Sequence, residues 1–86
     1  SNMSEILFAT LGTSQRIMKL IESDKEYGGP QSINDICQNL HMSNRNARSI
    51  LSRMYKKGKI DRVSEGVYRA KGDSREYDGN KPHYRK

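Results

Sequence analysis

The chain has 86 residues, a net charge of +6 at pH 7 and a single cysteine, Cys37. A chain of this length forms one small domain that buries only about 60% of its unfolded surface, so its core is modest. One cysteine excludes an intramolecular disulfide, which is typical of a reducing cytosol. The sequence also shows no signal peptide and no apolar run near the ~18 residues of a membrane span. We therefore expect a cytoplasmic protein without a membrane partner.

Basic residues are concentrated in the second half of the chain. Residues 1–42 have a net charge of −2, whereas residues 43–86 have a net charge of +8. A basic half on a small domain is the pattern expected of a phosphate-binding surface, and it would place a bacterial protein at the nucleoid. The alternative interpretation is a solvated charged face that keeps the protein soluble.

The N-terminal residues divide into two parts. Residues 1–2, which precede Met3, look like the remnant of a tag and are left out of the fold. Residues 3–12 contain an apolar group that predicts a short extra helix stopped by Gly12. This segment can pack on its own domain, extend the next helix, or join two copies of the chain as a homodimer.

A first helix is predicted over residues 13–24, with Thr13 or Ser14 as its cap. Its buried stripe consists of Ile17, Met18, Leu20 and Ile21. Residues 28–30 (GGP) then break the helix.

A second helix is predicted over residues 32–40. The hydroxyl of Ser32 can accept a hydrogen bond from the backbone of Asp35, whose carboxylate sits near the positive end of the helix. Apolar residues at helical spacing follow on one face, and Cys37 lies among them. We interpret Cys37 as a small core residue and not as a redox or metal-binding group.

A third helix over about 43–57 follows a turn at His41-Met42, in which Met42 plugs the core. Ser43 caps this helix, and Gly58 ends it. Two β-type runs, residues 59–63 and 67–70, then surround a turn in which Gly66 can take a positive φ, and they predict a hairpin. The domain therefore covers residues 13–71. Residues 72–86 have no apolar periodicity and are expected to form a mobile basic tail.

The third helix separates into an apolar side and a side for binding. Ala47, Ile50, Leu51 and Met54 face the core, and no carboxylate occurs between Ser43 and Ile60 on the opposite side. Arginine, asparagine and serine side chains suit the edges of DNA bases. The candidates for base contacts are Asn44, Arg45, Asn46, Arg48 and Ser49. The candidates for phosphate contacts are Ser43, Ser52, Arg53, Lys56, Lys57, Arg62 and Arg69. Glu65 at the hairpin tip argues against deep insertion into the minor groove.

The run from Ser32 to Ala70 resembles the winged helix-turn-helix domains of small bacterial, plasmid and phage transcription regulators. Residues 32–36 match the start of the second helix, 42–43 match the turn and cap, and 47–51 with Met54 match the recognition helix. Residues 58–62 and 66–68 match the wing. The resemblance implies an α+β fold, mainly α, with three helices and a two-stranded β wing. It also implies that the outer face of the third helix enters the major groove of double-stranded DNA.

Three classes of function compete on this evidence. We expect a sequence-specific DNA-binding regulator. The alternative is a protein–protein adaptor module that binds through an exposed apolar patch at residues 6–11. We do not expect an enzyme, because two histidines and one cysteine provide neither a metal set nor a nucleophile–base pair. We likewise expect no cofactor and no small-molecule ligand.

Overall fold

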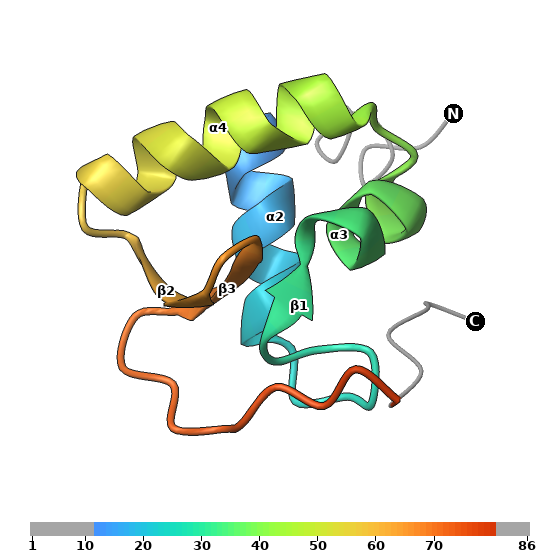
Figure 1. The fold of residues 1–86 in the computed structure, drawn as a ribbon, viewed down its shortest axis with the longest axis vertical. Helices are drawn as coiled ribbons and strands as arrows, with labels where there is room; N and C mark the ends of the chain where they lie inside the picture. The colour runs from blue at the N-terminus through green and yellow to red at the C-terminus, as the bar shows by residue number, and fades with distance from the viewer. Residues whose placement is uncertain (1–11, 81–86) are drawn as a thin grey trace, which may run out of the picture.

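The computed structural model describes residues 12–80, which form a small α+β unit of three helices and one three-stranded antiparallel sheet (Figure 1). The elements in chain order are α2 (Thr13–Glu22), β1 (Gln31–Ser32), α3 (Ile33–Leu40), α4 (Asn44–Lys56), β2 (Ile60–Ser64) and β3 (Val67–Ala70). The helix expected within residues 3–12, and with it the proposed homodimer contact, lies outside the described residues except for Gly12.

The helix starts follow local capping chemistry, with one correction. The Ser32 hydroxyl accepts from the backbone N–H of Asp35 and the Asp35 carboxylate accepts from that of Ser32, both at 3.1 Å, which confirms the predicted cap of α3. The Ser43 hydroxyl accepts from the backbone N–H of Asn46 at 3.2 Å and caps α4 as predicted. The prediction for α2 was wrong, because its cap is Gly12, with Thr13 already helical.

Helix α2 ends two residues earlier than predicted, at Glu22. The turn after it closes on the helix, and the N–H of Gly29 donates to the carbonyl of Ile21 at 3.1 Å. Gly28 packs so closely on the backbone of Ser23 that any side chain at position 28 would collide with it. The glycines that break the helix therefore also allow the chain to return beside it.

Strand β1 is an addition to the predicted two-stranded hairpin. It pairs with β3 through Gln31 opposite Tyr68 and Ser32 opposite Val67, so β3 is the central strand and β1 and β2 are the two edges. Gln31 is fully buried, and its amide donates to the carbonyl of Tyr27 at 2.6 Å and accepts from the Asn39 side chain at 3.2 Å. A two-residue strand after GGP lacks the alternating pattern that predicts strands, so only its partner reveals it.

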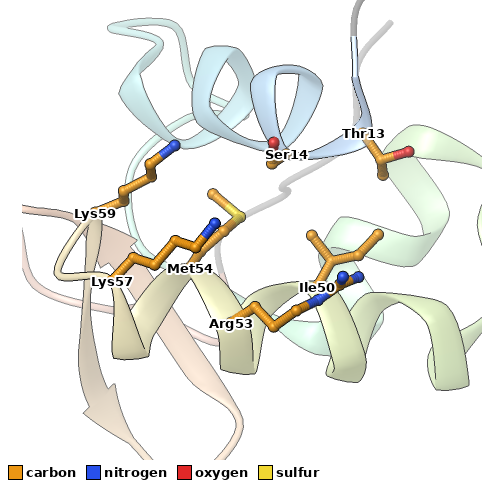
Figure 2. A pocket seen from close by; sticks show the side chains of 7 residues that line it. All are labelled: Thr13, Ser14, Ile50, Arg53, Met54, Lys57 and Lys59. Atoms are coloured by element: carbon orange, nitrogen blue, oxygen red, sulfur yellow. The ribbon is translucent and has the colours of Figure 1, made fainter.

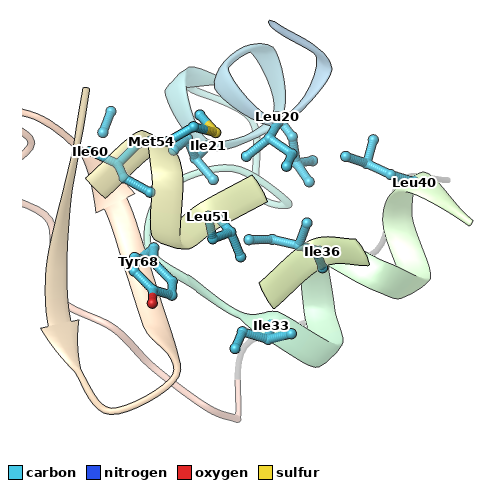
Figure 3. Close-up of a cluster of buried hydrophobic side chains, with 12 residues drawn as sticks. Leu20, Ile21, Ile33, Ile36, Leu40, Leu51, Met54, Ile60 and Tyr68 are labelled. Carbon is cyan, nitrogen blue, oxygen red and sulfur yellow. The ribbon is translucent and has the colours of Figure 1, made fainter. Parts of the chain in front are cut away.

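The core lies between the three helices and the inner face of the sheet (Figure 3). Leu51 of α4 lies between Ile36 of α3 and Tyr68 of β3, and Tyr68 is buried in this core. Cys37 and Met42 pack against this core but stay partly exposed, so the predicted plug at Met42 covers the core from its edge.

The described part of the C-terminal segment contacts the domain through Arg75. Residues 71–80 run along the side of the molecule away from α4 (Figure 1). The Arg75 guanidinium donates to the carbonyls of Ser23 at 2.8 Å and Ile21 at 3.3 Å, and it pairs with the Asp73 carboxylate at 2.8 Å. This contact ties the segment to the C-terminal end of α2, where exposed carbonyls favour a cation.

Within residues 12–80, no helix combines the length and the apolar character that a membrane crossing requires.

Candidate nucleic-acid interface

The outward face of α4 is polar and open to solvent. Ala47, Leu51 and Met54 are buried on one side of the helix, as predicted from their spacing. On the other side Arg45, Ser49 and Lys56 are exposed. The absence of carboxylates along α4 leaves this face with positive charges and neutral hydrogen-bonding groups and without a negative charge.

The side chain of Asn44, a predicted base contact, is hydrogen-bonded to other side chains of the protein. Its side-chain oxygen accepts from Arg48 Nε at 2.6 Å, and its side-chain nitrogen donates to the Asn34 side chain of α3 at 3.3 Å. These bonds engage both ends of the Asn44 amide. They orient Arg48 through its Nε and leave the two terminal guanidinium nitrogens of Arg48 available for a ligand.

A groove of about 430 Å³ separates α4 from the hairpin β2–β3. Arg48 and Ser52 line it from α4, and Arg62 lines it from β2. Its floor includes Tyr68 and Ile33. The groove therefore gathers two cations that lie far apart in the sequence, although Glu65 from the hairpin turn shares it and opposes an anionic ligand.

The hairpin places its two predicted phosphate contacts on opposite faces. Arg62 is paired with Tyr68 across the strands, which places it on the groove side. Arg69 is paired with Asp61 on the other side, where its Nε lies 3.9 Å from the Asp61 carboxylate. The structure thus joins Arg62 to the α4 surface and separates Arg69 from it.

Tyr55 is a surface residue that the sequence analysis missed. Its side chain is 46% exposed and makes an edge-to-face contact with Tyr68 at a ring-centroid distance of 6.4 Å. Tyr68 lines the groove, so this contact brings the Tyr55 ring near the groove edge. The helical period alone places Tyr55 at the border of the core. Only its contact with Tyr68 of β3 shows that it lies near the groove.

Arg53 and Lys57 lie on the opposite flank of α4, beside the first turn of α2 (Figure 2). The predicted contact residues of α4 therefore form one exposed strip, which borders the hairpin on one side and α2 on the other. Arg48, Ser52 and Arg62 are on the hairpin side, and Arg45, Ser49 and Lys56 lie between the two sides. Asn46 is exposed toward the α2 side, and Ser43 is used in its cap.

Cys37 has no feature of a reactive thiol. Burial raises the pKa of its thiol, even though the nearby Arg48 acts in the opposite direction. The thiolate is therefore disfavoured at neutral pH. The described part of the chain brings together no group of three or more histidine, cysteine or acidic side chains able to hold a metal ion.

Comparisons with known proteins add no further information about this surface, since no family model, no curated protein and no solved structure matches the chain.

Proposed function

We propose that this protein is a sequence-specific binder of double-stranded DNA with a winged helix-turn-helix fold, and that it acts as a transcriptional regulator. Helix α4 enters the major groove with Arg45, Arg48, Ser49 and Asn46 toward base edges. The hairpin β2–β3 is the wing, and Arg62 at the groove contacts the DNA backbone.

One observation supports this proposal above the others. The exposed side of α4 carries arginine, lysine, serine and asparagine with no carboxylate, and a hairpin with a further arginine flanks it. A solvated helix face ordinarily mixes both signs of charge, whereas a phosphate-facing surface excludes the negative one. An arginine held by its Nε, as Arg48 is, presents its remaining nitrogens in the geometry that guanine O6 and N7 accept.

The first experiment is selection from a randomised pool of duplexes of about 30 base pairs, at low and at physiological salt, followed by sequencing of the retained DNA. We expect an enriched motif, and a palindromic motif would indicate a dimer. Retention without a motif would contradict sequence specificity. An absence of retention at low salt would overturn DNA binding and favour the adaptor function, whose candidate patch at residues 6–11 lies outside the described residues.

The second experiment tests the orientation of α4 on the selected site. Arg45→Ala should cost about 1–3 kcal/mol of specific binding and relax the preference at one base position, because Arg45 points outward near the start of the helix. Lys56→Ala should weaken all sequences about equally, and Lys25→Ala, in the loop after α2, serves as the charge-matched control. Unchanged specific affinity of Arg45→Ala would show that a different face of the helix meets the DNA.

A further inference from the structure

A second depression, of about 290 Å³, lies on the flank of α4 away from the hairpin groove. Arg53 lies in the last turn of α4, Lys57 is the C-cap of that helix, and Lys59 follows two residues later. Figure 2 shows the Lys57 and Lys59 amino groups extending toward the first turn of α2, where Thr13 and Ser14 lie. We refer to this depression as the basic pocket.

The basic pocket has the chemistry of an anion site. Arg53 comes from α4, Lys57 and Lys59 come from the segment that joins α4 to β2, and the hydroxyls come from α2. No carboxylate lines the pocket. Within residues 12–80, Arg53, Lys57 and Lys59 form no ion pair, so their charges are not compensated locally. Like charges that converge on one hollow repel each other, and a bound anion relieves that repulsion.

The apolar and backbone surroundings reinforce the charge. Ile50 and Met54 form part of the pocket wall and limit access of water to one side of a bound group. The first turn of α2 contains no acidic residue, so the positive end of the helix dipole adds to the potential of the basic pocket.

We propose that the basic pocket binds a phosphate group. Lys57 and Lys59 contact the phosphate oxygens from one wall, the Thr13 and Ser14 hydroxyls donate from the other, and Arg53 closes the rim. A volume near 290 Å³ suits a phosphate group or a small phosphate ester, because it is at the lower end of the range for small-molecule sites. The phosphate comes either from the DNA strand that flanks α4 on this side or from a free phosphate ester. The chemistry is the same in both cases, and the proposal stands without the DNA-binding function.

The deciding measurement is a titration of the ¹⁵N-labelled chain with inorganic phosphate at constant ionic strength, followed by amide chemical shifts. We expect saturating shifts at Thr13, Ser14 and Lys59, and a loss of affinity of about tenfold or more in the double variant Lys57→Gln/Lys59→Gln. Lys25→Gln/Lys71→Gln removes the same charge from exposed positions that do not line the basic pocket, and it should titrate as the unmodified chain does. Absent shifts, or equal affinity in both double variants, would overturn the proposal.

The source of the phosphate is decided on duplex DNA with single variants. Each phosphate contact contributes about −0.9 to the slope of log affinity against log salt. If the basic pocket takes a backbone phosphate, Lys59→Gln makes this slope shallower by about that amount, whereas Lys25→Gln leaves it unchanged. An unchanged slope together with a positive phosphate titration assigns the basic pocket to a free phosphate or phosphate ester. If the chain binds no DNA at all, the phosphate titration still decides the proposal.

Discussion

Arg48 shows how a single neighbour sets the direction of a long side chain. The bond from its Nε to Asn44 holds the guanidinium at the edge of the hairpin groove, and Asn34 holds Asn44 in turn. A long arginine side chain loses considerable rotamer freedom when a ligand immobilises it, and part of that entropy is already lost in the free protein.

We expect Asn44→Ala to lower specific DNA affinity by about 0.5–1.5 kcal/mol, the range for one hydrogen bond, because Arg48 loses its fixed orientation. Affinity for a scrambled duplex should stay nearly constant, since no charge is removed. Fluorescence anisotropy on the two duplexes measures the difference. Gln38→Ala, at an exposed position of α3, is the control. Equal losses on both duplexes would show that Asn44 acts on binding in general and not through Arg48.

The ion pair of Asp73 with Arg75 makes the stability of the folded protein depend on pH. The hydrogen bond from Arg75 holds the pKa of the Asp73 carboxyl below its ordinary value of 3.8, despite opposing burial of that side chain, which is 9% exposed. A carboxyl with a lowered folded-state pKa contributes stability above its unfolded pKa, and this contribution is lost as pH falls through the folded pKa.

Asp73→Asn should therefore destabilise the protein at neutral pH, and the difference from the unmodified chain should shrink as the pH falls below 3.8 and through the lowered folded-state pKa of Asp73. Chemical unfolding at several pH values, followed by circular dichroism, tests this expectation. Glu22→Gln, at an exposed position of α2, provides a charge-matched comparison. A stability difference that stays constant over the whole range would contradict the role of this ion pair.

At the scale of elements, the hairpin brings a carboxylate to a surface that is otherwise positive. Glu65 lines the groove beside Arg48 and Arg62 and forms no ion pair within residues 12–80. We expect Glu65→Gln to strengthen DNA binding by about 0.5–1 kcal/mol, because a like charge near the phosphates is removed. The gain should decrease as salt is raised. Weaker binding of this variant would show that Glu65 contacts the DNA bases or orders the turn.

Elements governed by local chemistry were predictable from the sequence. The caps at Ser32 and Ser43 and the positive φ of 74° at Gly66 depend on residues within one turn of the chain. Strand β1 and the Arg75 contact depend on partners more than thirty residues away, so no local pattern announces them. Within the candidate site, the exposed strip of α4 followed from helical spacing. The separation of Arg62 from Arg69 and the position of Tyr55 required the strand register and the packing.

For the whole molecule, one small core supports both sides of α4. Leu51 is fully buried, and Figure 3 shows it among side chains from α3 and β3. Leu51→Ala should cost about 2–5 kcal/mol of unfolding free energy, which is a large share of the 5–15 kcal/mol typical of small proteins. Thermal unfolding measures the loss, and Val63→Ala, at an exposed position of the hairpin, should change stability little. A small effect of Leu51→Ala would mean that the core re-forms around the space left by the side chain.

The hairpin turn is joined to the start of α3 by a backbone hydrogen bond from Ile33 to the carbonyl of Gly66, 3.0 Å long. Strand β1 pairs with β3 immediately beside it. The hairpin and the helix pair α3–α4 are therefore held at one separation. In the proposed complex, binding therefore depends on the spacing between the contacted segments of the duplex as well as on their sequence. A cognate site in which one base pair is inserted between the segment under α4 and the segment under the hairpin would be rejected as a wrong spacing, even though every contacted base remained the same.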